Sequence, residues 1–156
     1  MTKPKKTFVL LLLFFFFSSC GYTPIFSKKE INFSLENVKF SGDKHIEKKI
    51  NNILYSYKNK PDKKEKISLV IASSKSTSIA SKNTKGEALT NRINVDVNAK
   101  IFFAENNFIE KNYSKTSIYT VVDRKSEQKL TENKLIENLS NEIAQQIIFE
   151  ISKNIK

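Results

Sequence analysis

The chain has 156 residues, of which 39% are hydrophobic, and it carries a formal net charge of +11 with one cysteine and one histidine. This length is sufficient for one compact domain with a single core. The single cysteine excludes an internal disulfide bond, so we expect apolar burial to stabilise the fold.

The first twenty residues have the features of an export signal. Three lysines precede an uninterrupted apolar run from Phe8 to Phe17, and Ser18, Ser19 and Cys20 follow it. A helix of ten residues rises about 15 Å, half the roughly 30 Å of a hydrocarbon core, so the run is too short to span a bilayer comfortably. A basic head, a short apolar core and small residues at the exit predict a removable signal. The alternatives are a secreted protein with an unrelated cysteine and an uncleaved membrane anchor.

The order Ser18-Ser19-Cys20 after the apolar run resembles the signal of bacterial lipoproteins, in which the cysteine sulfur receives a diacylglycerol and the chain is cut before the cysteine. The resemblance implies a signal peptide over 1–19, a lipidated tether over 20–30 and a domain over 31–156. Gly21 is compatible with passage to the outer membrane, because an aspartate there tends to retain such proteins in the inner membrane. Two or three acyl chains anchor a protein firmly where one is marginal.

Loss of the leader lowers the formal charge from +11 to +8, because it removes three lysines and no acidic residue. A basic surface suits an anionic partner such as nucleic acid, anionic lipid headgroups or a phosphorylated glycolipid. Export argues against nucleic acid. The abundance of Lys, Ile and Asn beside only two arginines is also the pattern of an AT-rich genome, so composition alone can account for part of the charge.

The first half of the domain predicts a strand, a helix and a second strand. Alternation over 31–40 changes phase at Glu36-Asn37, which indicates one strand with a bulge. Ser41-Gly42-Asp43 then supplies a turn and a helix cap. The helix has one apolar stripe, formed by Ile46, Ile50, Ile53, Leu54 and Tyr57. A charged loop over 59–64 and a strand over 67–72 follow.

The second half of the domain predicts two strands and a long helix. The polar stretch 73–85 is either the continuation of a long hairpin or a mobile loop, and we expect mobility at its tip, 83–86. Strict alternation over 92–103 indicates a half-buried strand, a turn over 105–107 follows, and 108–120 returns as its partner. The helix over 126–154 has an apolar stripe formed by Leu135, Ile136, Leu139, Ile143, Ala144, Ile147, Ile148 and Ile151.

This order, β-α-β-β-β-α, predicts an α+β fold: a two-layer sandwich with two helices packed on a four-stranded, mostly antiparallel sheet. The sequence lacks a set of residues typical of an enzyme, since His45 stands alone and no phosphate loop, HExxH or GxSxG motif is found. We therefore expect no catalytic site, no metal site and no cofactor. Asp123-Arg124 is expected to cap the long helix.

Four basic residues are candidates for binding an anion: Lys82, Lys85, Arg92 and Lys100. They lie on or beside the polar stretch and on the polar side of the strongest strand, among neutral Asn, Ser and Thr side chains that can hydrogen-bond to sugars and phosphates. The alternative is an ordinary solvated face in a lysine-rich protein.

The segment Cys20-Gly21-Tyr22-Thr23-Pro24-Ile25-Phe26, directly after a lipoprotein signal, resembles the mature N-terminus of the LptE family of lipopolysaccharide-assembly lipoproteins. The predicted order of elements follows that family over the whole mature chain, although lysine replaces much of its arginine and the polar hairpin has no proline or aromatic residue at its tip. The resemblance implies a lipid-anchored protein of the outer membrane that faces the periplasm. It also implies two partners, the outer-membrane β-barrel LptD, whose lumen the domain plugs, and lipopolysaccharide, whose assembly at the cell surface it assists.

On this hypothesis Cys20 anchors the domain, the sheet edge and the polar hairpin contact the barrel, and the basic residues approach lipopolysaccharide phosphates. The main alternative is an auxiliary lipoprotein of a lipid-transport ABC system, which would travel with a substrate-binding subunit and a permease. A lipid-anchored enzyme is the third possibility.

Overall fold

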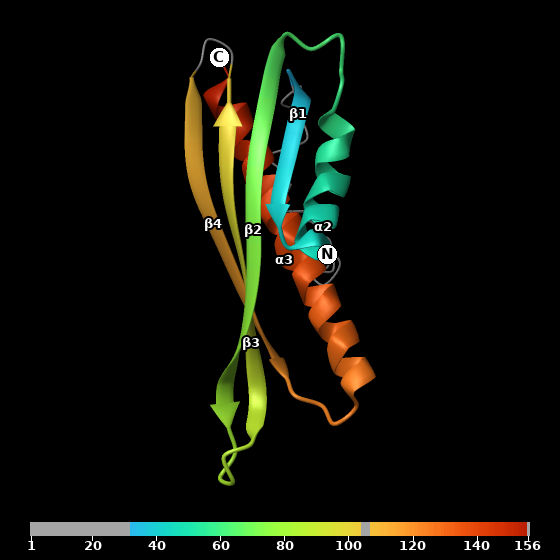
Figure 1. The fold of residues 1–156 in the computed structure, drawn as a ribbon, viewed down its shortest axis with the longest axis vertical. Coiled ribbons are helices and arrows are strands. Elements are labelled where there is room, and N and C mark those ends of the chain that lie inside the picture. Colours follow the sequence, from blue (N-terminus) through green and yellow to red (C-terminus); the bar gives the residue numbers. More distant parts are fainter. Residues whose placement is uncertain (1–31, 104–106, 156) are drawn as a thin grey trace, which may run out of the picture. The chain divides into compact units, whose positions relative to one another are not determined.

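The computed structural model describes residues 32–103 and 107–155, within a compact unit that spans Ile31–Lys156. The expected signal peptide, Cys20 and the tether lie outside the described residues, as does most of the turn expected over 105–107. The elements follow in the order β1 (Phe33–Gly42), α2 (Lys44–Leu54), the 3-10 turn η1 (Tyr55–Tyr57), β2 (Glu65–Lys82), β3 (Ala88–Phe102), β4 (Phe108–Thr120) and α3 (Lys125–Asn154) (Figure 1). The predicted fold class is confirmed: two helices and an open four-stranded sheet, in the order β-α-β-β-β-α.

The strands lie in the sheet in chain order, β1-β2-β3-β4. β1 runs parallel to β2, with α2 as the crossover, and the other pairs are antiparallel. The register of β1 against β2 shifts between Leu35 and Asn37, which confirms the predicted bulge. The bulge returns Val38 and Phe40 to the face that carries Phe33 and Leu35, so the strand keeps one apolar face despite its change of phase.

Asp43 begins α2 as the sequence predicts. Its Oδ1 accepts hydrogen bonds from the backbone N–H groups of His45 (2.9 Å) and Ile46 (3.1 Å), two donors that have no partner within the helix. Ile46, Ile50 and Leu54 are buried, and Ile53 and Tyr57 pack at the margin of the core. The helix therefore presents the predicted stripe to the sheet.

The polar stretch after Ser73 is the continuation of β2 and not a loop. β2 pairs with β3 from Ser68↔Phe102 to Lys82↔Ala88, so the hairpin alternative is confirmed. Register is held by β3, whose Ile93 and Val95 are buried on the inner face opposite Thr77 and Lys75. Hydrogen bonds close the tip around Asn83, whose side-chain oxygen accepts from the N–H groups of Lys85 and Glu87, both at 2.9 Å. Mobility of the tip stays a prediction.

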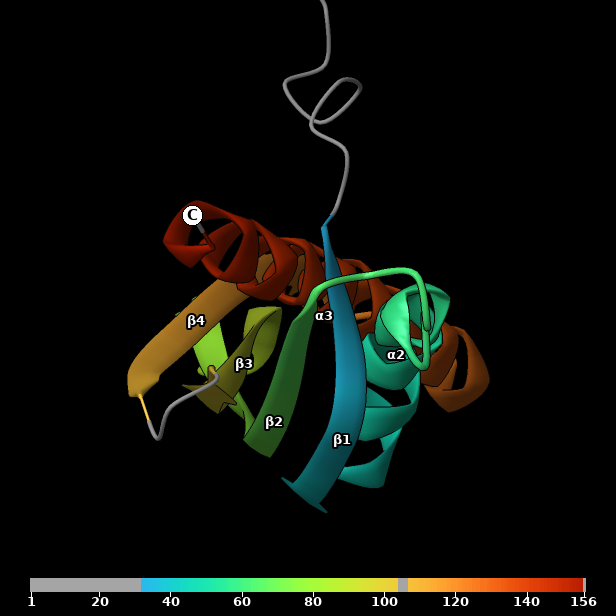
Figure 2. The same ribbon diagram turned by 90° about the horizontal axis from the view of Figure 1, so that it is seen from above.

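Both helices cover one face of the sheet, α2 beside β1 and α3 along β3 and β4 (Figures 1 and 2). The core between the layers contains Phe33, Leu35, Ile67, Leu69, Ile71, Ile93, Val95, Val97, Ala99, Ile101 and the buried stripes of both helices. Every residue of the predicted α3 stripe is buried except Leu135, which lies at the margin. Arg124 occupies the N-cap position of α3, as expected, but it caps through its backbone carbonyl, since its side chain makes no capping hydrogen bond.

Ion pairs and one hydroxyl group fix α3 at its margins. Lys49 on α2 meets Glu137 at 2.6 Å, and Lys115 on β4 meets Glu142 at 3.0 Å. The hydroxyl of Tyr119, at the end of β4, donates a hydrogen bond to Glu132. These contacts border the apolar stripe that faces the core. No helix among the described residues is long and apolar enough to cross a membrane.

Candidate binding surface

The outer face of the sheet, opposite the helices, is polar over β3 and β4. Residues of β3 alternate, so that Ile93, Val95, Val97, Ala99 and Ile101 are buried against the helices while Arg92, Asn94, Asp96, Asn98 and Lys100 lie on the outer face. Antiparallel pairing places Ser114, Thr116 and Asn112 of β4 beside them. The same alternation that builds the core therefore builds this face.

Hydrogen bonds join the outer side chains into a ladder. The side-chain oxygen of Asn94 accepts from the hydroxyl groups of Thr116 (2.7 Å) and Ser114 (3.2 Å). The amide nitrogen of Asn98 donates to Asn112 (2.7 Å) and to Glu110 (2.9 Å). A network of this kind fixes the orientation of amide and hydroxyl groups that are still open to solvent.

A shallow depression of about 380 Å³ lies across the middle of this face. It is lined by Ala72, Ser73, Ser74, Asp96, Val97, Asn98, Asn112, Tyr113 and Ser114. Hydroxyl and amide groups dominate the lining, and the one carboxylate disfavours an anionic ligand there. The depression can accept a hydrogen-bonding polar surface or a neutral sugar, and it has no arrangement of acid, base and nucleophile.

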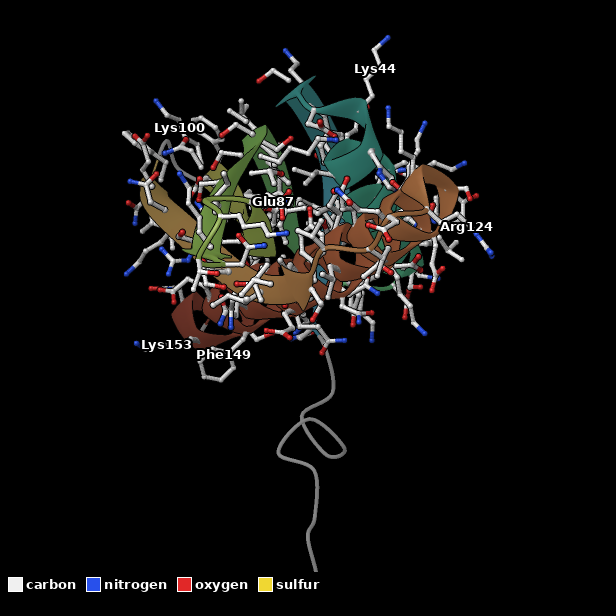
Figure 3. The ribbon with its side chains drawn as sticks, turned by 90° about the horizontal axis from the view of Figure 1, so that it is seen from below. Lys44, Glu87, Lys100, Arg124, Phe149 and Lys153 are labelled. Atoms are coloured by element: carbon white, nitrogen blue, oxygen red, sulfur yellow. The ribbon has the colours of Figure 1, made fainter. Side chains whose placement is uncertain are left out.

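The hairpin formed by Ser74–Lys82 and Ala88–Arg92 carries three of the four predicted basic residues. Lys82 ends β2 opposite Ala88, Lys85 lies in the turn, and Arg92 lies on the outer face opposite Ser78 and Ile118. All three side chains are exposed. Glu87, labelled in Figure 3, also lies at the tip, where its carboxylate reduces the local positive charge. This carboxylate accepts a hydrogen bond from the side-chain amide of Asn83 at 2.7 Å.

Lys100 does not belong to this group. It lies eight residues along β3 from Arg92, which is about 26 Å at the rise of an extended strand. It is also neutralised locally, because its Nζ lies 3.3 Å from Glu110 on β4. The hydrogen bond from Asn98 and the contact with Lys100 hold the pKa of Glu110 below its ordinary value, which keeps this ion pair charged. The structure thus separates Lys100 from the candidate anion-binding residues of the hairpin.

The structure adds exposed apolar residues to the hairpin end. Ile79, Leu89 and Ile118 are about half exposed. Ile118 is an expected apolar residue of the strand over 108–120, whereas sequence reasoning did not single out Ile79 and Leu89, because neither belongs to a periodic apolar pattern.

One edge of β2 is also unpaired. β1 pairs with β2 only as far as Gly42 and Ser73, so within the described residues no strand lies beside the edge of Ser74–Lys82. Asp43 marks the end of the paired region, since its N–H donates to the carbonyl of Ser73 (3.0 Å) and its carboxylate meets Lys75 at 3.0 Å. Burial acts to raise the pKa of Asp43, but the hydrogen bonds from Ile46 and His45 and the contact with Lys75 lower it below its ordinary value.

This arrangement of helices, sheet and protruding hairpin occurs in known structures. The fold is shared with solved bacterial lipoproteins. Rare lipoprotein B from Shewanella oneidensis matches with a TM-score of 0.59 at 14% identity, over 77% of this chain and 95% of that one. Lipoprotein B from Nitrosomonas europaea matches with a TM-score of 0.56 at 17% identity, over 77% of this chain and 83% of that one.

A minor lipoprotein from Acinetobacter baumannii gives a similar result, with a TM-score of 0.56 and 17% identity over 78% of this chain and 92% of that one. No protein-family model and no curated protein matches the sequence. The comparisons therefore establish a common fold that spans nearly the whole length of the lipoproteins matched.

Proposed function

We propose that this chain is an outer-membrane lipoprotein of the LptE type, anchored through Cys20 and facing the periplasm. In this proposal its domain occupies the lumen of the β-barrel LptD and assists the assembly of lipopolysaccharide at the cell surface. The proposal is supported by two features that occur together. A lipoprotein-like signal is followed directly by Cys20-Gly21-Tyr22-Thr23-Pro24-Ile25-Phe26, and the fold is shared with solved lipoproteins over most of both chains.

The outer face supports a role inside a barrel. The interior wall of an outer-membrane barrel is polar, so a domain that fills it needs a hydrogen-bonding surface without a high net charge. The ladder of Asn94, Asn98, Asn112, Ser114 and Thr116 is such a surface. The half-exposed apolar residues of the hairpin add contact area at its far end.

The hairpin tip supports contact with phosphate groups. Lys82, Lys85 and Arg92 are exposed, and among the described residues none of the three forms an ion pair. A charged donor without a carboxylate partner gains most from a phosphate, because it need not give up an existing pair. We propose these three residues, without Lys100, as the lipopolysaccharide contacts.

Co-purification tests the partner. A tagged full-length chain, extracted from membranes with mild detergent, is expected to bring down a large outer-membrane barrel protein in constant ratio. Recovery with a substrate-binding subunit and a permease would instead indicate the auxiliary lipoprotein of an ABC system. Recovery of the chain alone would contradict both.

A Cys20→Ser chain tests the anchor. It is expected to incorporate no labelled fatty acid and to leave the membrane fraction.

Binding of purified lipopolysaccharide tests the tip. The triple variant Lys82→Gln, Lys85→Gln, Arg92→Gln is expected to bind about tenfold more weakly, because each exposed charged hydrogen bond contributes a modest share of the free energy. Lys100→Gln is the matched control and is expected to bind like the unaltered chain, since Lys100 is already paired with Glu110. Equal loss in the control would show that overall charge, and not the tip, determines binding.

A further inference from the structure

The strongest concentration of positive charge in the described domain is at the end opposite the hairpin tip. Residues 58–66, the loop between η1 and β2 together with the first two residues of β2, contain five lysines and two acidic residues. The tip residues 82–87 contain two lysines and one acidic residue, and 123–127, where α3 begins, contain two of each sign. A general enrichment in lysine does not explain a charge that is concentrated at one end.

This lysine-rich segment contacts the first residues of β1 on both sides of the strand. The N–H of Lys60 donates to the Ser34 hydroxyl at 2.7 Å, and the N–H of Asn59 donates to the Leu35 carbonyl at 3.1 Å. On the other side of β1, Phe33 is paired with Glu65 and Ser34 with Lys66. The backbone of the lysine-rich loop is thus fixed to the first three residues of β1.

The lysine side chains of the loop are open to solvent. Lys60, Lys64 and Lys66 are exposed, and Lys60 and Lys64 form no ion pair among the described residues. The Nζ group of Lys63 lies 3.6 Å from Asp62, an exposed pair of the kind that contributes little. An anionic surface can therefore contact these ammonium groups without breaking a strong interaction.

An apolar patch adjoins the loop on the outer face of the sheet. Phe102 and Phe108 lie opposite each other at the ends of β3 and β4, with ring centroids 5.7 Å apart, and are 36% and 52% exposed. Val70 lies beside them, 38% exposed, in a depression of about 390 Å³ that Lys39 also lines. Figure 1 shows the start of β1, the loop before β2 and the ends of β3 and β4 at the same end of the domain.

We infer that this end of the domain docks on an anionic lipid surface, with the loop lysines on the headgroups and Phe102 and Phe108 at the depth of the acyl chains. Lysines beside exposed aromatic residues are the composition that binds the membrane interface, and a lipid anchor is strengthened by a nearby polybasic segment. The inference rests on the proposed anchoring through Cys20.

The tether limits how far the start of β1 can lie from the anchored bilayer. From Cys20 to Asn32 the chain can reach at most about 40 Å, whereas the hairpin tip lies roughly 60 Å along β2 from its start. The lysine-rich loop is therefore held within reach of the anchored bilayer, and the hairpin is left to contact other partners.

Tryptophan fluorescence tests the inference, because the chain contains no tryptophan and a single introduced one reports without background. The lipidated full-length chain with Phe108→Trp is reconstituted on vesicles of phosphatidylglycerol and phosphatidylethanolamine, or of phosphatidylcholine alone, each with brominated lipid as quencher. Leu89→Trp at the hairpin end is the matched probe. Quenching is expected at position 108 on anionic vesicles and is expected to disappear in 0.5 M salt, a condition that screens surface charge at about 4 Å.

Charge variants identify the residues. Lys60→Gln, Lys63→Gln, Lys64→Gln is expected to shift the docking equilibrium by about a hundredfold, since each lysine near an anionic surface contributes a factor of about five. The control Lys125→Gln, Lys129→Gln, Lys134→Gln removes the same charge from exposed residues of α3 and is expected to leave quenching unchanged.

Several outcomes would overturn the inference. Equal quenching at positions 89 and 108, or quenching indifferent to anionic lipid and to the loop variant, would show that no specific end docks. A blue shift at position 108 without bromolipid quenching would show that protein covers the patch. Flotation separates the two proposals: a chain that floats with vesicles without quenching contradicts docking alone, and a chain that does not float contradicts the anchor and docking together.

Discussion

Gly42 occupies a position that no other residue can fill. Its φ is +98°, and a Cβ atom built there would lie 1.9 Å from the carbonyl oxygen of Ser73. That oxygen also accepts the N–H of Asp43 at 3.0 Å, so the backbone cannot move away without loss of the junction between β1 and α2. Gly86 has a similar φ of +85°, but no atom lies within 4 Å of its Cβ position.

Gly42→Ala is expected to lower the free energy of unfolding by about 2–4 kcal/mol, because strain in the left-handed region and a backbone clash add together. Gly86→Ala is the matched control and is expected to cost about 1 kcal/mol, the strain alone. Urea denaturation followed by circular dichroism measures both. Equal losses would mean that the contact with Ser73 is relieved at no cost.

Tyr113 shows how burial changes a titration. Its hydroxyl group is buried between β4 and α3 without a hydrogen-bond partner in the described part of the chain. Burial, with a smaller contribution from the negative charge of Glu150, raises the pKa of Tyr113 from 10.0 to about 12. The folded protein therefore holds this proton at a pH at which the unfolded chain has lost it.

Linkage fixes the sign of the effect on stability. Because the folded pKa is raised, the stabilising contribution is complete below pH 10 and is lost as the pH rises through about 12. Tyr113→Phe is expected to remove this part of the alkaline loss and to cost little at pH 7, since it deletes an unpartnered polar atom. Denaturation midpoints between pH 9 and 12 measure it. Identical pH profiles for the two chains would contradict the assignment.

Among the elements, α3 contains residues that differ widely in burial and therefore in their expected contribution to stability. Ile147 is fully buried in the stripe that faces the sheet, whereas Leu130, near the start of the helix, is 70% exposed. Spacing alone places Leu130 within reach of the stripe, because the helical period is 3.6 residues. Leu130 is exposed although its turn reaches the sheet, since Glu132 on the same turn accepts a hydrogen bond from Tyr119 of β4.

Ile147→Ala is expected to lower the free energy of unfolding by about 2–5 kcal/mol, since the truncation leaves a cavity in a closely packed core. Leu130→Ala is the matched control on the same helix, because it also removes three carbon atoms. It is expected to cost less than about 0.5 kcal/mol. Thermal or urea unfolding of the two variants gives the comparison. A large loss at Leu130 would show that the start of α3 packs on a surface that only a partner or a second copy provides.

The strand β2 shows how far sequence reasoning extends at this scale. Ile67, Leu69 and Ile71 alternate and predict a strand, but the stretch that follows is mostly Ser, Thr and Lys and left a hairpin and a loop as alternatives. Pairing with β3 decides between the hairpin and the loop. The buried face of β3 extends to Ile93, beyond the residues that pair with the apolar part of β2. A polar strand can be held in register by its neighbour, and a pattern within one segment does not contain that information.

At the scale of the whole molecule, the sheet is covered in one half and open in the other. Between β1 and β3 the amides of β2 are enclosed, whereas beyond Ser73 one edge is free. Backbone groups alternate in direction along a strand, and the carbonyl of Ser73 faces the β1 side, so the N–H groups of Lys75, Thr77 and Ile79 face the free edge.

Hydrogen exchange is expected to follow this division. The amides of Ile67, Leu69 and Ile71 are expected to exchange roughly a hundredfold more slowly than those of Lys75, Thr77 and Ile79, because the latter are exposed without any unfolding. Exchange monitored by NMR on the isolated membrane-extracted chain gives the rates, and addition of the proposed barrel partner gives a second measurement. Protection of the amides of Lys75, Thr77 and Ile79 in the free chain would contradict an open edge.

The candidate surface was predictable only in part. Lys82, Lys85 and Arg92 were identified by type and neighbourhood, and the hairpin brings them to one end. Lys100 shared their chemistry, but its distance along β3 and its pairing with Glu110 separate it from them. The lysines of 58–66 looked like an ordinary charged loop, and they gained significance only when the structure fixed that loop around the start of β1.

The sequence by itself determined the elements of this protein, their order and the buried face of each, because apolar periodicity and capping residues such as Asp43 act over a few neighbours. The prediction of an export signal at the first residues also depends on the sequence alone, because a signal is recognised from its order of basic, apolar and small residues. Only the tertiary structure decided the length of the hairpin, the separation of Lys100, and the gathering of a basic loop and two phenylalanines at one end. These features depend on strand pairing between residues far apart in the chain. The stability of a paired strand depends on the strand beside it in the sheet, and a local sequence pattern does not contain that information.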